Sequence, residues 1–138
     1  LNRKEKYDFD AAERLGWGNL RATDVVIGES SLLNIRGIEI SVSRDSSEWR
    51  EVTGVLARYS VGRPDGYADR AIIADAFFAV TEAGVTPRVV TSDQGILVAM
   101  LRVSGEDPGR ISKKERARIY RDGFTVSINS REIIVVQP

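Results

Sequence analysis

Two stretches in the second half of the chain place aspartates in apolar surroundings. "ADRAIIADAFF" contains Asp69 and Asp75, and in "RVVTSDQGI" an apolar strand-like run ends on Asp93. Carboxylates that crowd together repel one another, and a divalent cation such as Mg²⁺, which takes oxygen ligands, neutralises them. Such a cation can activate water and stabilise the departing oxygen of a phosphodiester. The three acids therefore raise the hypothesis of a metal-dependent hydrolytic site.

Composition excludes the other common hydrolytic sites. The 138 residues include no Cys and no His, which rules out a thiol nucleophile, an imidazole base, a disulfide and a Cys/His zinc site. The formal net charge is zero, so no overall field draws the protein to nucleic acid or to an anionic membrane. There is no signal-peptide pattern and no apolar run of about twenty residues, so no membrane insertion is expected. Hydrolysis would have to use carboxylates, hydroxyls, Lys or Arg.

Hydrophobic periodicity predicts strands alternating with helices. Strands are expected over residues 24–28, 37–43, 86–93, 124–128 and 132–138, the last two as a hairpin. One helix is expected to begin with Ser30 or Ser31 as its N-cap. Further helices are expected over residues 46–60, 68–84, 95–104 and 112–123. The alternation implies βαβ units, so the predicted fold class is α/β, a three-layer α/β/α arrangement with a mostly parallel central sheet.

The chain is expected to hold one domain, residues 24–138, preceded by a lead-in segment. The lead-in, residues 1–23, is predicted to carry a short helix over residues 10–15 and to pack on the domain through Leu15 and Trp17.

In such sheets ligands gather beyond the carboxyl ends of the strands. Glu29 follows the first predicted strand, Asp93 follows another, and a helix that begins near Asp69 can present its first turn there. Each acid also has a structural interpretation: Asp69 as a helix N-cap, Asp93 as a turn residue before Gly95, and Glu29 as a first-turn acid. Asp75 lies six residues after Asp69, a rotation of about 600°, so it leans to another face of the helix.

A basic segment, "KKERARIYR", covers residues 113–121. Its cations could contact RNA phosphates, with Tyr120 stacking on a base. A solvated helix face is the favoured interpretation. There is no GxGxxG, GKS or GKT sequence for phosphate binding.

The acids and their neighbours resemble a known family. "DRAIIADAFF" followed by "RVVTSDQGI" resembles the second half of PIN domains, where an Asp starts an apolar helix and the next strand ends in T-x-D. "VVIGESSLL" stands where the family has its first strand and first acid, which here is Glu29 rather than Asp. "EIIVVQP" resembles the last PIN strand. The resemblance covers residues 24–138. Among PIN-like domains, the sequence most resembles the C-terminal toxin domains of RHS-type polymorphic secreted proteins.

PIN domains are three-layer metal-dependent ribonucleases whose clustered acids hold Mg²⁺ or Mn²⁺. The resemblance therefore implies Asp69 and Asp93 as metal ligands, with Glu29 as the third. Asp75 would give a tighter spacing to Asp93, nearer to that of compact PIN domains, and is the alternative to Asp69. Asp69 is preferred because the apolar residues that follow it fit the family pattern better.

The family has a further acid on a helix after its first strand. In this sequence Glu51 is the candidate for that acid, with Glu48 as the second choice.

The resemblance also implies a biological role. It is that of an endoribonuclease toxin, delivered by a producing bacterium, acting in the cytoplasm of a target cell and neutralised by a cognate immunity protein. A start at Leu1 rather than Met fits a domain excised from a longer polypeptide.

Two alternatives remain. One is a PIN-like binding module without catalysis, supported by Glu29 in place of Asp and by the zero net charge. The other is a non-nuclease α/β toxin that modifies nucleotides.

Overall fold

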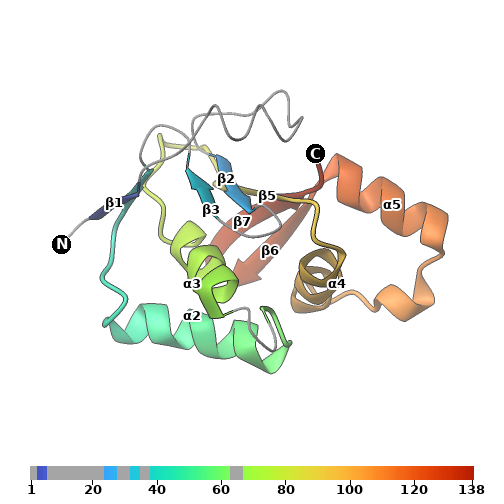
Figure 1. Cartoon of the computed structure of the whole chain (residues 1–138), viewed down its shortest axis with the longest axis horizontal. Helices are drawn as coiled ribbons and strands as arrows, with labels where there is room; N and C mark the ends of the chain where they lie inside the picture. Colours follow the sequence, from blue (N-terminus) through green and yellow to red (C-terminus); the bar gives the residue numbers. More distant parts are fainter. Residues whose placement is uncertain (1–2, 6–23, 28–31, 35–37, 63–66) are drawn as a thin grey trace.

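The computed structural model describes residues 3–5, 24–27, 32–34, 38–62 and 67–138 (Figure 1). Within these ranges the chain forms a mixed α/β fold with a five-stranded main sheet and a separate two-stranded sheet. No helix in the described part of the chain combines the length and apolar character needed to cross a membrane.

The described residues form seven strands and four α-helices. The strands are β1 (Arg3–Glu5), β2 (Asp24–Ile27), β3 (Leu32–Asn34), β4 (Ile38–Ile40), β5 (Arg88–Thr91), β6 (Phe124–Ile128) and β7 (Arg131–Val136). The helices are α2 (Ser47–Arg58), α3 (Tyr67–Ala76), α4 (Gln94–Val103) and α5 (Lys113–Asp122), with a 3₁₀ turn, η1, at Pro108–Arg110.

The main sheet has the strand order β3-β2-β5-β7-β6. The three central strands run parallel, since β5 pairs with β2 on one side and with β7 on the other. Both outer strands are antiparallel to their neighbours. The prediction of an α/β fold is confirmed, but the sheet is mixed, and parallel pairing is confined to its centre.

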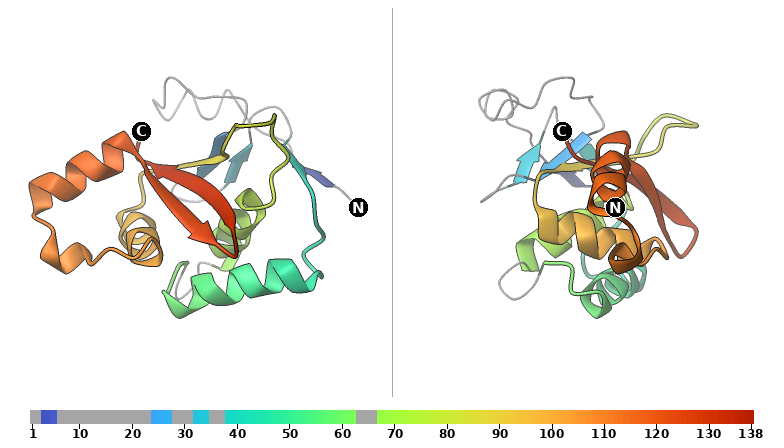
Figure 2. Two further views of the ribbon diagram at one scale, coloured as in Figure 1. Left: turned by 180° about the vertical axis from the view of Figure 1, so that it is seen from behind. Right: turned by 90° about the vertical axis from the view of Figure 1, so that its right-hand side faces the viewer.

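The parallel strands β2, β5 and β7 are added to the sheet in one direction along the chain. Right-handed crossovers between strands added in one direction lie on the same face of a sheet. Figure 2 accordingly shows α2, α3 and α4 below the sheet. On the opposite face of β6, Thr125 and Ser127 are exposed, so the described residues do not cover that part of the sheet with the second helical layer that was predicted.

Apolar side chains on the covered face form the core. Val89 of β5 and Ile133 and Val135 of β7 are fully buried against Leu97 and Met100 of α4 and their neighbours. This packing fixes the central strands, and with them the edge at which β5 ends.

Several predicted local signals are confirmed. Ser46 caps α2, with its hydroxyl accepting from the amide of Trp49 at 3.2 Å, and Ser112 caps α5 by accepting from Glu115 at 3.2 Å. The hairpin turns at Asn129 and Ser130, whose φ angles of 50° and 67° match a two-residue hairpin turn.

Two predictions are wrong. Residues 32–34 were expected in a helix but form β3, because their backbone pairs with β2. The helix expected to reach Gly84 ends at Ala76 instead. Beyond that point the amide of Ser41 donates to the carbonyl of Phe78 at 2.8 Å, and the amide of Val80 donates to the carbonyl of Glu39 at 2.8 Å. This pairing with β4 and with the residue that follows it takes the chain out of the helix.

Little of the lead-in lies within the described residues. Residues 3–5 form β1, which pairs antiparallel with β4 in a separate small sheet. The helix expected over residues 10–15 and its contacts through Leu15 and Trp17 lie outside the described residues.

Candidate functional site

Asp93 lies where β5 ends and α4 begins. Its carboxylate accepts a hydrogen bond from the amide of Ile96 at 3.1 Å, so it is the N-cap of α4. Its own amide donates to the hydroxyl of the fully buried Thr91 at 3.1 Å, which fixes the backbone of the turn. A side chain at Gly95 would come within 3.2 Å of the Asp93 carboxylate, so glycine leaves room for the cap. The Asp93 side chain is exposed at the carboxyl edge of the sheet.

Asp69 lies in the first turn of α3 and is half-buried. The predicted N-cap role is wrong, because the helix already begins at Tyr67. Burial raises the pKa of Asp69, and the negative charge of Asp93 raises it further. Asp69 and Asp93 therefore lie close enough for the negative charge of Asp93 to act on Asp69.

No cation balances this pair within the described residues. Neither Asp69 nor Asp93 forms an ion pair with a Lys or Arg there. Beside Asp93 is a pocket of about 360 Å³, lined by Ser92, Gln94 and Gly95 as well as Asp93 itself. The described residues contain no cluster of three or more acids, His or Cys that could hold a metal. The predicted third ligand, Glu29, lies outside the described residues.

Asp75, the alternative to Asp69, is occupied by structural contacts. It is 4% exposed and accepts hydrogen bonds from the indole of Trp49 at 2.9 Å and from the guanidinium of Arg44 at 2.6 and 3.3 Å. These contacts tie the segment before α2, and α2 itself, to the end of α3. Asp75 is therefore a buried structural acid, and Asp69 is the acid of α3 that faces Asp93.

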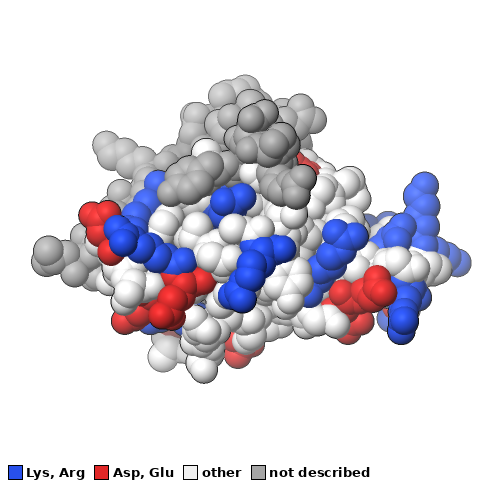
Figure 3. Space-filling model, turned by 90° about the horizontal axis from the view of Figure 1, so that it is seen from below, with Lys and Arg blue, Asp and Glu red and all other residues white. Residues whose placement is uncertain are grey.

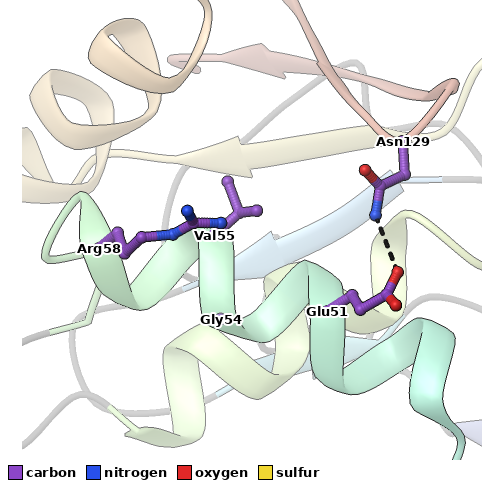
Figure 4. A pocket seen from close by; sticks show the side chains of 5 residues that line it. All are labelled: Glu51, Gly54, Val55, Arg58 and Asn129. Carbon is purple, nitrogen blue, oxygen red and sulfur yellow. Dashed lines mark hydrogen bonds between the residues drawn. The ribbon is translucent and has the colours of Figure 1, made fainter.

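Glu51 and Glu48 lie away from the aspartate pair. The carboxylate of Glu51 accepts from the amide group of Asn129 at 3.3 Å, as Figure 4 shows, and Glu48 accepts from Arg131 at 3.1 Å. Arg131 begins β7, which runs parallel to β5, so both glutamates are at the amino edge of the sheet. Asp93 is at the opposite, carboxyl edge, and the structure does not bring the predicted fourth acid to it.

The pocket in Figure 4 is the hollow beside Glu51. It has a volume of about 510 Å³ and is lined by Gly54, Val55 and Arg58 together with Glu51 and Asn129. Gly54 is in mid-helix with open space where a side chain would be. The sequence interpretation missed this hollow, since its only local signal is a glycine inside a helical pattern.

The network around Asp75 was also missed. Arg44 and Asp75 are 31 positions apart, and no local periodicity joins them. An acid inside the apolar run "AIIADAFF" was the one available sign that a partner had to reach it.

Comparison with known proteins adds no relative. No protein-family model, no curated protein and no solved structure matches this chain. Functional arguments must therefore start from the site itself.

Proposed function

We propose that this chain is a metal-dependent endoribonuclease whose site is the carboxyl edge of the sheet around Asp69 and Asp93. The supporting observation is that the half-buried Asp69 experiences the negative charge of Asp93, and neither acid forms an ion pair with a Lys or Arg among the described residues. Such a pair is unfavourable in isolation, and an external cation is the simplest means of relieving it.

The donor chemistry fits a hard divalent cation. Carboxylate oxygens are the ligands that Mg²⁺ and Mn²⁺ take, and Mg²⁺ is often bound by only one or two carboxylates plus water and substrate phosphates. When bound, the cation supplies activation of water and charge stabilisation at a phosphodiester.

Glu29 is proposed as the third ligand from its position in the sequence. It comes two residues after Ile27, just as Asp93 comes two residues after Thr91. Ile27 and Thr91 are register partners in the parallel pair of β2 and β5. The equal offset supports Glu29 as the acid that follows the neighbouring strand at the same edge.

We further propose that the chain has a PIN-like fold and acts as a secreted bacterial toxin. The supports for this proposal are the "DRAIIADAFF" and "RVVTSD" sequences, the parallel centre of the sheet, and the proximity of Asp69 and Asp93. In this proposal the protein is delivered into the cytoplasm of a target cell and cleaves RNA there. A cognate immunity protein protects the producer by covering the carboxyl edge.

The test is RNA cleavage by Asp93→Asn. Asparagine caps helices about as well as aspartate, so this change removes the charge and keeps the start of α4. Cleavage with Mg²⁺ should fall by more than about 100-fold, because even residues that only orient metal ligands contribute 10–100-fold. EDTA should abolish cleavage by the wild type. Glu51→Gln, at the opposite edge, is the matched control and should cleave normally.

Three outcomes would redirect the proposal. Equal cleavage by wild type and Asp93→Asn, or cleavage that survives EDTA, would overturn the metal-acid mechanism. RNA binding without cleavage would favour the binding module. Consumption of NAD or nucleotides while RNA stays intact would favour the non-nuclease toxin.

A further inference from the structure

Helix α5 concentrates positive charge in a chain whose net charge is zero. Its cationic residues are Lys113, Lys114, Arg116, Arg118 and Arg121, and its acidic residues are Glu115 and Asp122. Arg116 is used within the fold, donating to the carbonyl of Pro108 at 2.7 Å. Arg118 lies 3.9 Å from Glu115 and 3.7 Å from Asp122, which at these exposed positions amounts to weak pairing.

Three of these cations form a stripe on one face of the helix. Lys114, Arg118 and Arg121 are spaced by four and then three residues, the spacing that brings side chains together along one side of a helix. All three are exposed, and neither Lys114 nor Arg121 has an ion-pair partner among the described residues. We refer to Lys114, Arg118 and Arg121 as the α5 basic face. It is about 10 Å long, the length of about three nucleotides.

The fold places this helix beside the edge that carries Asp93. The amide of Gln137 donates to the carbonyl of Tyr120 at 2.7 Å, which ties the end of α5 to the residue that follows β7. Val136, the last residue of β7, is the register partner of Val90 in β5, which ends one residue later. Figure 1 shows the same relation, with α5 beside the C-terminus. In Figure 3, Lys and Arg side chains gather at the end of the molecule where α5 lies.

We propose that the α5 basic face binds the phosphate backbone of RNA and guides it to the carboxyl edge of the sheet. This inference rests on the proposed function for its substrate class. The alternative in which Tyr120 stacks on a base does not hold, because Tyr120 is only 3% exposed and packs in the core. The face therefore offers charge without an aromatic platform. Phosphate contacts of this kind position a strand and carry no sequence information, so binding should be salt-dependent and insensitive to sequence.

The experiment measures binding of a labelled single-stranded RNA in EDTA, by fluorescence anisotropy over a range of salt concentrations. The test variant is Lys114→Gln/Arg121→Gln. Its control is Arg50→Gln/Arg58→Gln, which removes the same charge from exposed positions of α2. The test variant should make the negative slope of log affinity against log salt shallower by about 1.4, since each phosphate contact to a single strand contributes about −0.7. The control should leave the slope unchanged, and thermal unfolding should show both variants folded.

Equal losses in both pairs, or no loss in the test pair, would overturn the inference, because the charge effect would be diffuse or absent. Binding of anionic vesicles in preference to RNA would also overturn it. The proposed function fails separately: if α5-dependent binding appears in EDTA but no RNA is cleaved with Mg²⁺, this inference stands and the nuclease proposal falls. If RNA is cleaved but affinity and slope are the same in the test pair and wild type, the reverse holds.

Discussion

The two ends of α3 place aspartates in opposite environments. Near its end, Asp75 is buried and receives hydrogen bonds from Trp49 and Arg44. In its first turn, Asp69 is half-buried and faces the negative charge of Asp93. The chain satisfies one acid completely and leaves the other with an unfavourable neighbour. An acid that already has its partners supports the fold, whereas an acid held against another acid is available for a cation from outside.

The largest expected effect comes from removing the satisfied acid. Asp75→Ala removes the hydrogen bonds that this buried carboxylate accepts from Arg44 and from the indole of Trp49, and should lower the free energy of unfolding by about 3 kcal/mol. The lower part of the usual range is expected because the Arg44 side chain is 43% exposed. Urea unfolding would measure it, with Asp69→Ala as the comparison. An equal or larger loss in Asp69→Ala would break the contrast between the two acids.

The next expected effect tests the proposed binding of a metal ion by Asp69 and Asp93. Mn²⁺ at a hundred times its dissociation constant should raise the free energy of unfolding of the wild type by about 2.7 kcal/mol. Asp93→Asn should lose this gain, and Asp75→Asn, which alters only the paired acid, should keep it. Thermal unfolding with and without Mn²⁺ would test this. Equal stabilisation of all three proteins would place the ion elsewhere.

The smallest effect is a pH dependence of stability. The folded pKa of Asp69 is raised above its ordinary value of 3.8, so ionising it disfavours the folded state. The wild type and Asp69→Asn should therefore differ least below pH 3.8. The wild type should lose stability relative to the variant as the pH rises from there through the folded pKa, and the difference should then level off. Urea unfolding at stepped pH would show this, and the opposite trend would mean that Asp69 has a favourable partner.

Local chemistry made part of the fold predictable. Ser46 and Ser112 cap their helices, and Asn129-Ser130 forms the hairpin turn, because each signal acts within a few residues. Backbone pairing between strands, whether they are neighbours in the chain or far apart, was not visible in this way. It converts the expected helix at residues 32–34 into β3 and ends α3 at Ala76.

The residues of the candidate site also differ in how far they could be predicted from local sequence. Asp93 could be placed because a strand and a helix boundary meet at it, and Asp69 because the helix before that strand begins beside the same edge. Glu51 could not be excluded from sequence, since only the direction of β7 shows that it is at the other edge. The role of Asp75 depends on Arg44, and nothing in the sequence connects the two.

Because β5 is the central strand of the sheet, the sheet is complete only after segments from both sides of β5 in the sequence have paired with it. Its Arg88 pairs with Asp24 on one side and with Ile134 on the other, so its neighbours come from opposite ends of the described chain. Contacts this distant in sequence form slowly. Until β7 of the β6–β7 hairpin has paired with β5 during folding, β5 has an unpaired apolar edge of the kind that pairs with other chains. The hairpin therefore acts as the closing step of assembly, and a chain cut before Phe124 should aggregate rather than fold.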